Sequence, residues 1–205
     1  MTNLEDHWDA IYSANPAEEV TWYQEIPAVS LELMALARIG VDDRVVDVGA
    51  GASTLVDHLL GVGHRHVVLV DFSAVALAAA RERLGEQAAA SFVLGDVLDL
   101  EIGSVAMWHD RAAFHFMVNP EERMRYKLVM ARHVPPGGHA IVATFGSDGP
   151  ERCSGLPVIR HSVGEIAEFF RPEFSLVESR REIHQTPWGG EQPFSFALLR
   201  RAASP

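Results

Sequence analysis

A short stretch of the sequence, WHDRAAFHF at residues 108–116, gathers two histidines, an aspartate and an arginine. Such side chains serve as metal ligands, as an acid–base pair, or as the rim of a pocket in which another group reacts. His109 and His115 are six positions apart, which suits neither two ligands on one helix face nor a compact ligand turn. We therefore expect no metal site in this stretch.

Three aspartates occupy comparable places in three apolar runs, RVVDVG, HVVLVD and ASFVLGD. An ionised Asp47 inside a valine run is costly unless it is paired, so it predicts either the ammonium group of a ligand or a salt bridge to an arginine such as Arg44. Asp71, 22 positions after Gly49, stands where nucleoside-binding sheets place a carboxylate for ribose hydroxyls. Asp96 can accept from the amino group of a base. In the simpler alternative, Asp71 caps the next helix and Asp96 belongs to a turn.

The stretch VVDVGAGAS contains Gly49, Ala50 and Gly51 at the exit of a predicted strand, directly before a predicted helix. Glycines at such a turn let the backbone approach a ligand closely, and the helix N-terminus offers free N–H groups. A dinucleotide-binding turn would have a third glycine at Thr54, and a nucleoside-sulfonium turn would have one at Ser53. The turn alone is a weak signal, but with three carboxylates at successive strand ends it predicts a nucleoside site.

Short apolar runs alternate with helical patterns through most of the chain. They predict strands at residues 44–49, 66–71, 90–96, 105–110 and 139–145, and helices at 53–63, 73–85, 119–134 and 162–171. Two further helices are predicted near the N-terminus: one at 14–23 with Asn15 as N-cap and Glu18 in a capping box, and one at 28–40 ending at Gly40. This alternation implies βαβ crossovers and a parallel sheet with helices on both faces.

The last two apolar runs, residues 174–186 and 192–201, are joined only by the short segment around PWGGE. A connection this short makes an antiparallel hairpin, since a parallel return needs a dozen or more residues. We therefore predict an α/β fold, a Rossmann-like three-layer sandwich with a mostly parallel seven-stranded sheet and an antiparallel C-terminal hairpin strand.

The composition is that of a globular protein of one domain, with 205 residues and 48% hydrophobic residues. The formal net charge of −11 disfavours nucleic acid as a partner, because phosphate-binding surfaces need clustered Lys and Arg. The single cysteine favours a reducing compartment, and neither a signal peptide nor a membrane-spanning run is recognisable. A cytoplasmic location is the resulting expectation.

In this order and spacing, VVDVGAGAS, VVLVDFS, LGDV and VPPGGHAIVATF resemble the motifs of class I S-adenosylmethionine-dependent methyltransferases. The resemblance spans roughly residues 43–201 and includes the terminal hairpin. HWDAIY, VTWYQ and WHDRAAFHF are similar to a subgroup related to thiopurine methyltransferases and elongation-factor lysine methyltransferases. The family resemblance implies an N-terminal helical lid at residues 1–40 and an S-adenosyl-L-methionine-binding domain at 41–205, together forming one compact domain.

The resemblance also implies a role for each candidate residue. His109 and Asp110 would lie beside the transferable methyl group, as a base or as groups that orient the acceptor. The remaining residues would bind the cofactor (Asp47, Gly49, Ala50, Gly51, Asp71, Phe72, Asp96, Val97, Trp22, Tyr23) or the substrate (Trp8, Tyr12, Arg111, Phe114, His115, Trp188). In the simpler alternative, Asp110 pairs with Arg111 or a helix terminus, and His115 fills the edge of the core.

The predicted activity is methyl transfer to a small-molecule nucleophile or to a protein lysine. Two alternatives remain open: an NAD-dependent oxidoreductase and a non-catalytic nucleoside-binding protein of the same fold. Asp47, the missing third glycine, the terminal hairpin and the absence of a Tyr-x-x-x-Lys pair count against the oxidoreductase. The sequence leaves the acceptor and the oligomeric state open.

Overall fold

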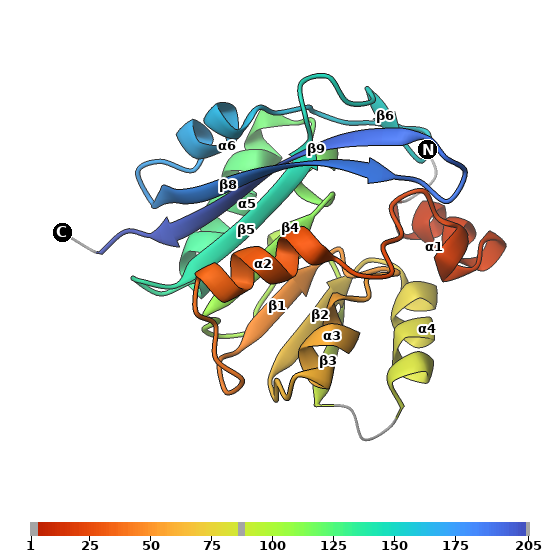
Figure 1. The fold of residues 1–205 in the computed structure, drawn as a ribbon, viewed down its shortest axis with the longest axis horizontal. Coiled ribbons are helices and arrows are strands. Elements are labelled where there is room, and N and C mark those ends of the chain that lie inside the picture. The colour runs from red at the N-terminus through yellow and green to blue at the C-terminus, as the bar shows by residue number, and fades with distance from the viewer. Residues whose placement is uncertain (1–3, 86–88, 204–205) are drawn as a thin grey trace.

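A seven-stranded sheet runs through the protein in the order β3-β2-β1-β4-β5-β9-β8 (Figure 1). The structure is a computed structural model and describes residues 4–85 and 89–203. Strands β1 to β5 are parallel, and β9 runs antiparallel to both of its neighbours. The strands are β1 (Val45–Val48), β2 (Val67–Asp71), β3 (Ala90–Leu94), β4 (Met107–Arg111), β5 (His139–Phe145), β8 (Phe174–Gln185) and β9 (Glu191–Arg201). The predicted fold class is confirmed.

Helices cover both faces of the sheet. The helices are α1 (Leu4–Ala14), α2 (Ala28–Leu36), α3 (Leu55–Gly61), α4 (Ala74–Leu84), α5 (Pro120–His133) and α6 (Val163–Phe169), with single 3₁₀ turns η1 (Ala17–Glu19), η2 (Val97–Asp99) and η3 (Phe114–Phe116). Side chains of α2, α3 and α4 form one apolar core with the sheet, and those of α5 and α6 form a second. The valine runs of β1 and β2 are buried along their whole length because both faces of the sheet are covered.

The C-terminal hairpin forms as predicted, and β9 lies between β5 and β8. Its register pairs Phe145 of β5 with Phe194 of β9, so the strand continues the sheet along the full length of β5. Predicted helix starts are also confirmed, since Asn119 caps α5 through the N–H of Glu121, and Ser73 caps α4 through the N–H of Ala76.

The helix predicted at residues 14–23 is wrong. The chain is helical earlier, in α1, and only the single turn η1 follows. Asn15 makes no N-cap: its side-chain amide donates to the carbonyl of Ile11 at the end of α1, and Pro16 has an extended ψ of 151°. The predicted end of α2 at Gly40 is also late, because α2 ends at Leu36 and Arg38 adopts the left-handed conformation at φ 55°.

A small hairpin, β6 (Arg152–Cys153) with β7 (Leu156–Pro157), lies between β5 and α6 and was not predicted. In Figure 1 it lies above the C-terminal ends of the parallel strands, close to α1. Residues from α1 and from this hairpin thus converge on the end of the sheet where the predicted carboxylates lie.

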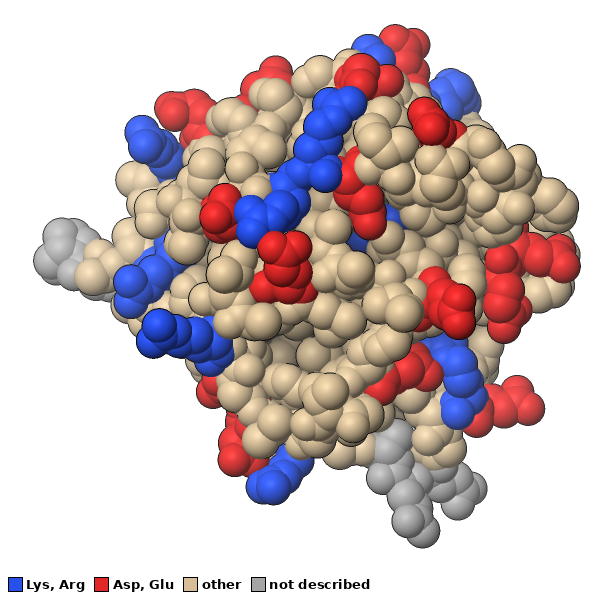
Figure 2. Space-filling model, viewed as in Figure 1, with Lys and Arg blue, Asp and Glu red and all other residues tan. Residues whose placement is uncertain are grey.

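On the face seen in Figure 2, basic and acidic side chains are interspersed. Many basic groups of the described residues lie in ion pairs, including those of Arg65 with Asp42 and of Arg180 with Glu32. Within residues 4–85 and 89–203, no helix has the length and apolar character needed to cross a membrane.

Candidate active site

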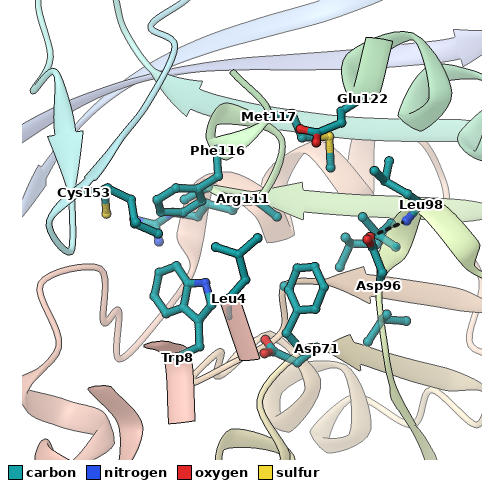
Figure 3. Close-up of a pocket in the computed structure, with 18 of the residues that line it drawn as sticks. Leu4, Trp8, Asp71, Asp96, Leu98, Arg111, Phe116, Met117, Glu122 and Cys153 are labelled. Carbon is teal, nitrogen blue, oxygen red and sulfur yellow. Dashed lines mark hydrogen bonds between the residues drawn. The ribbon is translucent and has the colours of Figure 1, made fainter. Parts of the chain in front are cut away.

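A cavity of about 360 Å³ opens at the carboxyl ends of β1, β2, β3 and β4. This is the edge at which parallel α/β sheets bind ligands, and the volume falls in the range of small-molecule sites. Figure 3 shows Asp71 and Asp96 at one end, Cys153, Arg111 and Phe116 at the other, and Leu4 between them. The two ends therefore differ in chemistry.

Asp71 ends β2 and lines the cavity while remaining 8% exposed. Its Oδ2 accepts from the N–H of Gly51 at 2.7 Å, and its Oδ1 accepts from the N–H of Ser73 at 2.8 Å. Burial raises the pKa of this carboxyl to about 6, and the two backbone donors oppose that shift. Each oxygen keeps a lone pair for a further donor, as two ribose hydroxyls would supply. Ser73, and not Asp71, caps α4.

Asp96 follows β3 and begins η2, where its Oδ1 accepts from the N–H of Leu98 at 2.8 Å. Val97 is buried and lines the cavity together with Phe72 from the end of β2. This part of the cavity therefore offers one carboxylate edge between apolar walls, which suits the amino group and the faces of a purine ring.

The glycine turn after β1 leaves no space for side chains. A Cβ on Gly49 (φ 64°) would lie 2.8 Å from the Cβ of Ala113, and one on Gly51 (φ 42°) would overlap the hydroxyl of Tyr12. Between them, the N–H of Ala50 donates to the carbonyl of Val70 at 3.0 Å, which ties the turn to β2. The backbone of this turn is thus held at the floor of the cavity.

Asp47 and His109 form a buried pair below the turn. Oδ1 of Asp47 lies 2.6 Å from Nδ1 of His109, and Nε2 of His109 lies 2.8 Å from the hydroxyl of Ser30 on α2. The alternative considered for Asp47, a salt bridge to Arg44, does not form, since Arg44 donates instead to the carbonyl of Ile102. Oδ2 of Asp47 is buried and has no hydrogen-bond partner in the described chain. Asp47 lines a second, small cavity of about 40 Å³ that adjoins the glycine turn.

Asp110 lies outside the cavity and is fully buried. Its carboxylate accepts from the N–H groups of Ala113 and Phe114 at the start of η3, and from the hydroxyl of Tyr126 at 2.6 Å. Burial raises its pKa to about 6. The helix-terminus alternative for Asp110 matches this geometry, whereas contact with a reacting group does not.

His115 and Phe114 also point into the core. Both are fully buried, and the His115 ring packs against Phe116 and Phe145 with centroids 4.5 and 4.8 Å apart. Burial lowers the pKa of His115 to about 3, so the ring is neutral near pH 7. In residues 4–85 and 89–203, no three His, Cys, Asp or Glu side chains are grouped as metal ligands would be.

The N-terminal aromatic residues reach the cavity through one face of α1. Leu4, Trp8 and Tyr12, spaced four residues apart, all line it, and Trp22 packs edge-on against Trp8 at 5.8 Å. Two other predicted residues, Tyr23 and Trp188, are absent from the lining; Trp188 is 72% exposed in the turn between β8 and β9.

Helix α1 is docked at both sides. Oδ1 of Asp9 accepts from the hydroxyl of Ser73 at 2.5 Å and from the N–H of Val75 at 3.2 Å, so α1 adds a carboxylate to the N-terminus of α4. On the other side, Nε2 of His7 lies 3.1 Å from the carbonyl oxygen of Ser154 in the β6–β7 hairpin.

Several lining residues were missed by the sequence analysis. They come from the segment after β4 and from the β6–β7 hairpin: Phe116, Met117, Val118, Glu122, Cys153, Leu156 and Pro157. Apart from Phe116, which ends the WHDRAAFHF stretch, they lie outside the quoted motifs. The spacing of Leu4, Trp8 and Tyr12 was a usable signal, since it places three apolar side chains on one helix face. Cys153 is a buried thiol whose pKa is raised to about 11 by burial.

Comparison with known proteins assigns the central part of the chain. Residues 45–138 match a family described as methyltransferase domain. No protein in the curated set matches at a significant level.

Solved structures with a similar fold cover nearly the whole chain. A methyltransferase dependent on S-adenosylmethionine from Anabaena variabilis has a TM-score of 0.77 at 18% identity, over 98% of this chain and 96% of that one. The 1,6-didemethyltoxoflavin-N1-methyltransferase of Burkholderia thailandensis, with its acceptor and S-adenosylhomocysteine bound, has a TM-score of 0.70 at 23% identity, over 94% and 81% of the two chains. At these identities the likeness concerns the fold.

The site also fits the donor of such enzymes. S-adenosylmethionine carries ribose hydroxyls, an adenine amino group and an ammonium group, and the cavity region offers the carboxylates of Asp71 and Asp96 and the unpartnered Oδ2 of Asp47. The backbone of Gly49, which lines the cavity, would lie beside the methionine part. Residues 45–138 thus match a methyltransferase domain, and the fold of the whole chain is similar to that of methyltransferases that depend on S-adenosylmethionine.

Proposed function

We propose that this enzyme methylates a small-molecule nucleophile bound inside the cavity, next to the sulfonium of S-adenosylmethionine. The observation that supports this most is the chemical division of the cavity. Its carboxylate end, with Asp71 and Asp96, matches a nucleoside, and its other end is walled by Trp8, Phe116 and Leu156. An acceptor that reaches the second end lies between α1 and the β6–β7 hairpin and needs an apolar body of its own.

In this proposal the donor is held by three carboxylates along the sheet edge. Asp71 accepts from the ribose hydroxyls, Asp96 from the adenine amino group between Phe72 and Val97, and Asp47 from the ammonium group. The backbone of the turn at residues 49–51 lies under the methionine part. Residues 1–40 act as the lid, with Trp8, Tyr12 and Trp22 above the donor.

When bound, S-adenosylmethionine would supply an electrophilic methyl group for in-line transfer to the nucleophile, with its sulfur as the leaving group. The protein contributes alignment and a dry wall, which account for much of the barrier reduction in such displacements. Aromatic faces such as that of Trp8 favour the cationic sulfonium. His109 acts here as a positioning residue for Asp47, and Asp110 as one for the turn that follows β4.

A protein lysine is the less favoured acceptor. It arrives as an ammonium ion and needs a base within hydrogen-bond reach. Among the described lining residues of the apolar end, none is an imidazole or a carboxylate, and the acidic ones, Asp71, Asp96 and Glu122, lie elsewhere in the cavity (Figure 3). The Burkholderia enzyme with a small heterocycle in its site supports the same choice by analogy.

The test begins with calorimetric titration of the purified protein with S-adenosylmethionine, S-adenosylhomocysteine and NAD. We expect saturable binding of the first two, lost in Asp71→Ala and kept in Asp42→Ala, an aspartate that is exposed in its ion pair with Arg65. Radiolabelled donor is then incubated with small-molecule and protein fractions of a cell extract, and label is expected in the small-molecule fraction. Label in protein lysines would favour the other acceptor, and binding of NAD alone would contradict methyl transfer.

A further inference from the structure

Arg111 carries an unused hydrogen-bonding edge beside the apolar end of the cavity. Its Nη1 donates to the carbonyl of Trp22 at 2.9 Å. Its Nε and Nη2 are buried and have no hydrogen-bond partner among the described residues, and the side chain is only 9% exposed. These two groups form one side of the planar guanidinium, the side that binds a carboxylate through two parallel hydrogen bonds.

The charge of Arg111 is incompletely compensated by the protein. The nearest carboxylate oxygen is Oε2 of Glu182, 4.0 Å from Nη2, which is beyond hydrogen-bond distance, and this oxygen also lacks a partner. The guanidinium lies 4.5 Å from the ring centroid of Phe194, a weaker cation–π contact. Burial lowers the pKa of Arg111 to about 10, and the group is therefore still a cation near pH 7.

Arg111 lies away from the nucleoside end, where it lines both the apolar end of the large cavity and the small cavity beside Asp47. It ends β4, lines the cavity, and lies beside Phe116 and Cys153 in Figure 3, away from Asp71 and Asp96. It is the basic residue among the described side chains that line this cavity. A buried cation whose carboxylate-binding edge is unused is costly, and an anionic ligand offsets that cost.

We propose that Arg111 selects the acceptor: the methylated molecule is a small, mostly apolar or aromatic anion whose carboxylate binds the Nε–Nη2 edge. This inference rests on the proposed function and narrows it to one substrate class. The anion enters where Trp22 anchors the guanidinium and where apolar side chains surround the rest of the molecule. A lysine ammonium is repelled at the same place, so the specificity is electrostatic as well as steric.

The test uses three fragments that share an aromatic ring and differ in charge: the anion benzoate, the neutral benzamide and the cation benzylamine. Each is titrated by calorimetry into the protein saturated with S-adenosylhomocysteine. We expect benzoate to bind about tenfold or more tightly than benzamide, as a buried bidentate pair provides, and benzylamine to bind weakest. The preference for benzoate should disappear in Arg111→Gln and persist in Arg65→Gln, which removes an exposed arginine paired with Asp42.

A second variant keeps the inference testable if Arg111→Gln does not fold. Glu182→Gln removes the competing negative charge near Nη2 but keeps an oxygen for the amide of Gln24, which now donates to Oε1 of Glu182. Benzoate binding should become several-fold tighter in this variant, while benzamide binding should stay the same. Equal binding of benzoate and benzamide to the wild-type protein, or no measurable binding of either at millimolar concentration, would overturn the proposal.

The same experiment separates an acceptor role from a role in holding the donor. S-adenosylhomocysteine has a carboxylate and 5′-methylthioadenosine has none. If Arg111→Gln weakens the binding of S-adenosylhomocysteine but not that of 5′-methylthioadenosine, the guanidinium binds the donor, and the acceptor assignment is overturned. If the wild-type protein binds neither ligand, the proposed function itself fails, which is a different result from a lost preference for benzoate.

Discussion

Asp47 and His109 face each other on neighbouring strands β1 and β4, with Oδ1 2.6 Å from Nδ1 and both side chains 3% exposed. The hydroxyl of Ser30 completes the chain at Nε2 and ties it to α2. The imidazole that the sequence suggests as a base is thereby held between two protein groups. It links the helix before β1 to the carboxylate beneath the glycine turn.

This pair predicts a large effect of removing the imidazole. His109→Ala leaves the Asp47 carboxylate buried without its partner, and we expect a loss of about 3–5 kcal/mol in the free energy of unfolding. Ser30→Ala removes only the outer hydrogen bond and should cost about 1–3 kcal/mol. Urea unfolding of both variants measures the difference. Equal and small effects would show that the chain of contacts contributes little to stability.

The raised pKa of Asp71 predicts a pH-dependent stability. Between 3.8 and about 6, the unfolded state releases the proton that the folded carboxyl retains, so the free energy of unfolding should fall as pH rises through this window. Asp110, with a pKa also raised to about 6, acts in the same direction. Urea unfolding at several pH values should therefore show a shallower decline in Asp71→Asn, which keeps the contribution of Asp110 but loses that of Asp71. An unchanged slope would contradict this assignment.

The same carboxyl should make donor binding pH-dependent with the opposite sign. Ribose hydroxyls donate to the ionised form, so the affinity for S-adenosylhomocysteine should rise as pH increases through about 6 and then level off. Calorimetry across that range checks the expectation. Asp71→Asn should bind more weakly and lose this pH dependence. A wild-type affinity independent of pH would argue against an ionised Asp71 as the ribose partner.

Close approach of Tyr12 to Gly51 predicts coupling between the lid and the glycine turn. In Gly51→Ala the new methyl group overlaps the Tyr12 hydroxyl, so stability and donor affinity should both fall. Tyr12→Phe deletes that hydroxyl and should partly rescue the alanine variant, leaving about 1 kcal/mol of strain from the left-handed backbone at φ 42°. A double-mutant cycle by urea unfolding measures the coupling. Strictly additive effects would show that the ring moves away freely.

The contact between Asp9 and Ser73 predicts how firmly α1 is held. Asp9→Ala removes an acceptor from the N-terminus of α4, so we expect a stability loss of about 1 kcal/mol and faster proteolytic cleavage within α1. S-adenosylhomocysteine should dissociate faster, as stopped-flow displacement would measure. Asp6→Ala is the matched control, because it removes an exposed carboxylate from the same helix. Identical dissociation rates in the two variants would exclude Asp9 as an anchor.

The central sheet was predictable from the sequence because its signals are local. The apolar runs before Asp71 and Asp96 each indicate one strand, and the glycines of the turn mark the exit of another, without reference to distant residues. Asn119 and Pro120 likewise specify the start of α5. The family resemblance then supplied the order of these parts.

The environment of the WHDRAAFHF side chains could not be predicted in the same way. Whether His109 faces the cavity or the core depends on Ser30, 79 positions away, and the surroundings of Asp110 depend on Tyr126 in α5. The β6–β7 hairpin has only two residues in each strand, too short for periodicity to reveal it. Asn15 led to a wrong prediction because asparagine often begins a helix, whereas here it follows the last residue of α1.

Docking of α1 at both sides of the cavity has a consequence for turnover. If α1 covers the bound donor as proposed, release of the spent donor requires the contacts of Asp9 with α4 and of His7 with the β6–β7 hairpin to open. Opening of this kind sets the maximal rate in many enzymes with lids. Acceptors of different nucleophilicity should then share one ceiling in kcat, and that ceiling should fall as solvent viscosity rises. The movement of α1 would then limit the turnover rate, whatever molecule receives the methyl group.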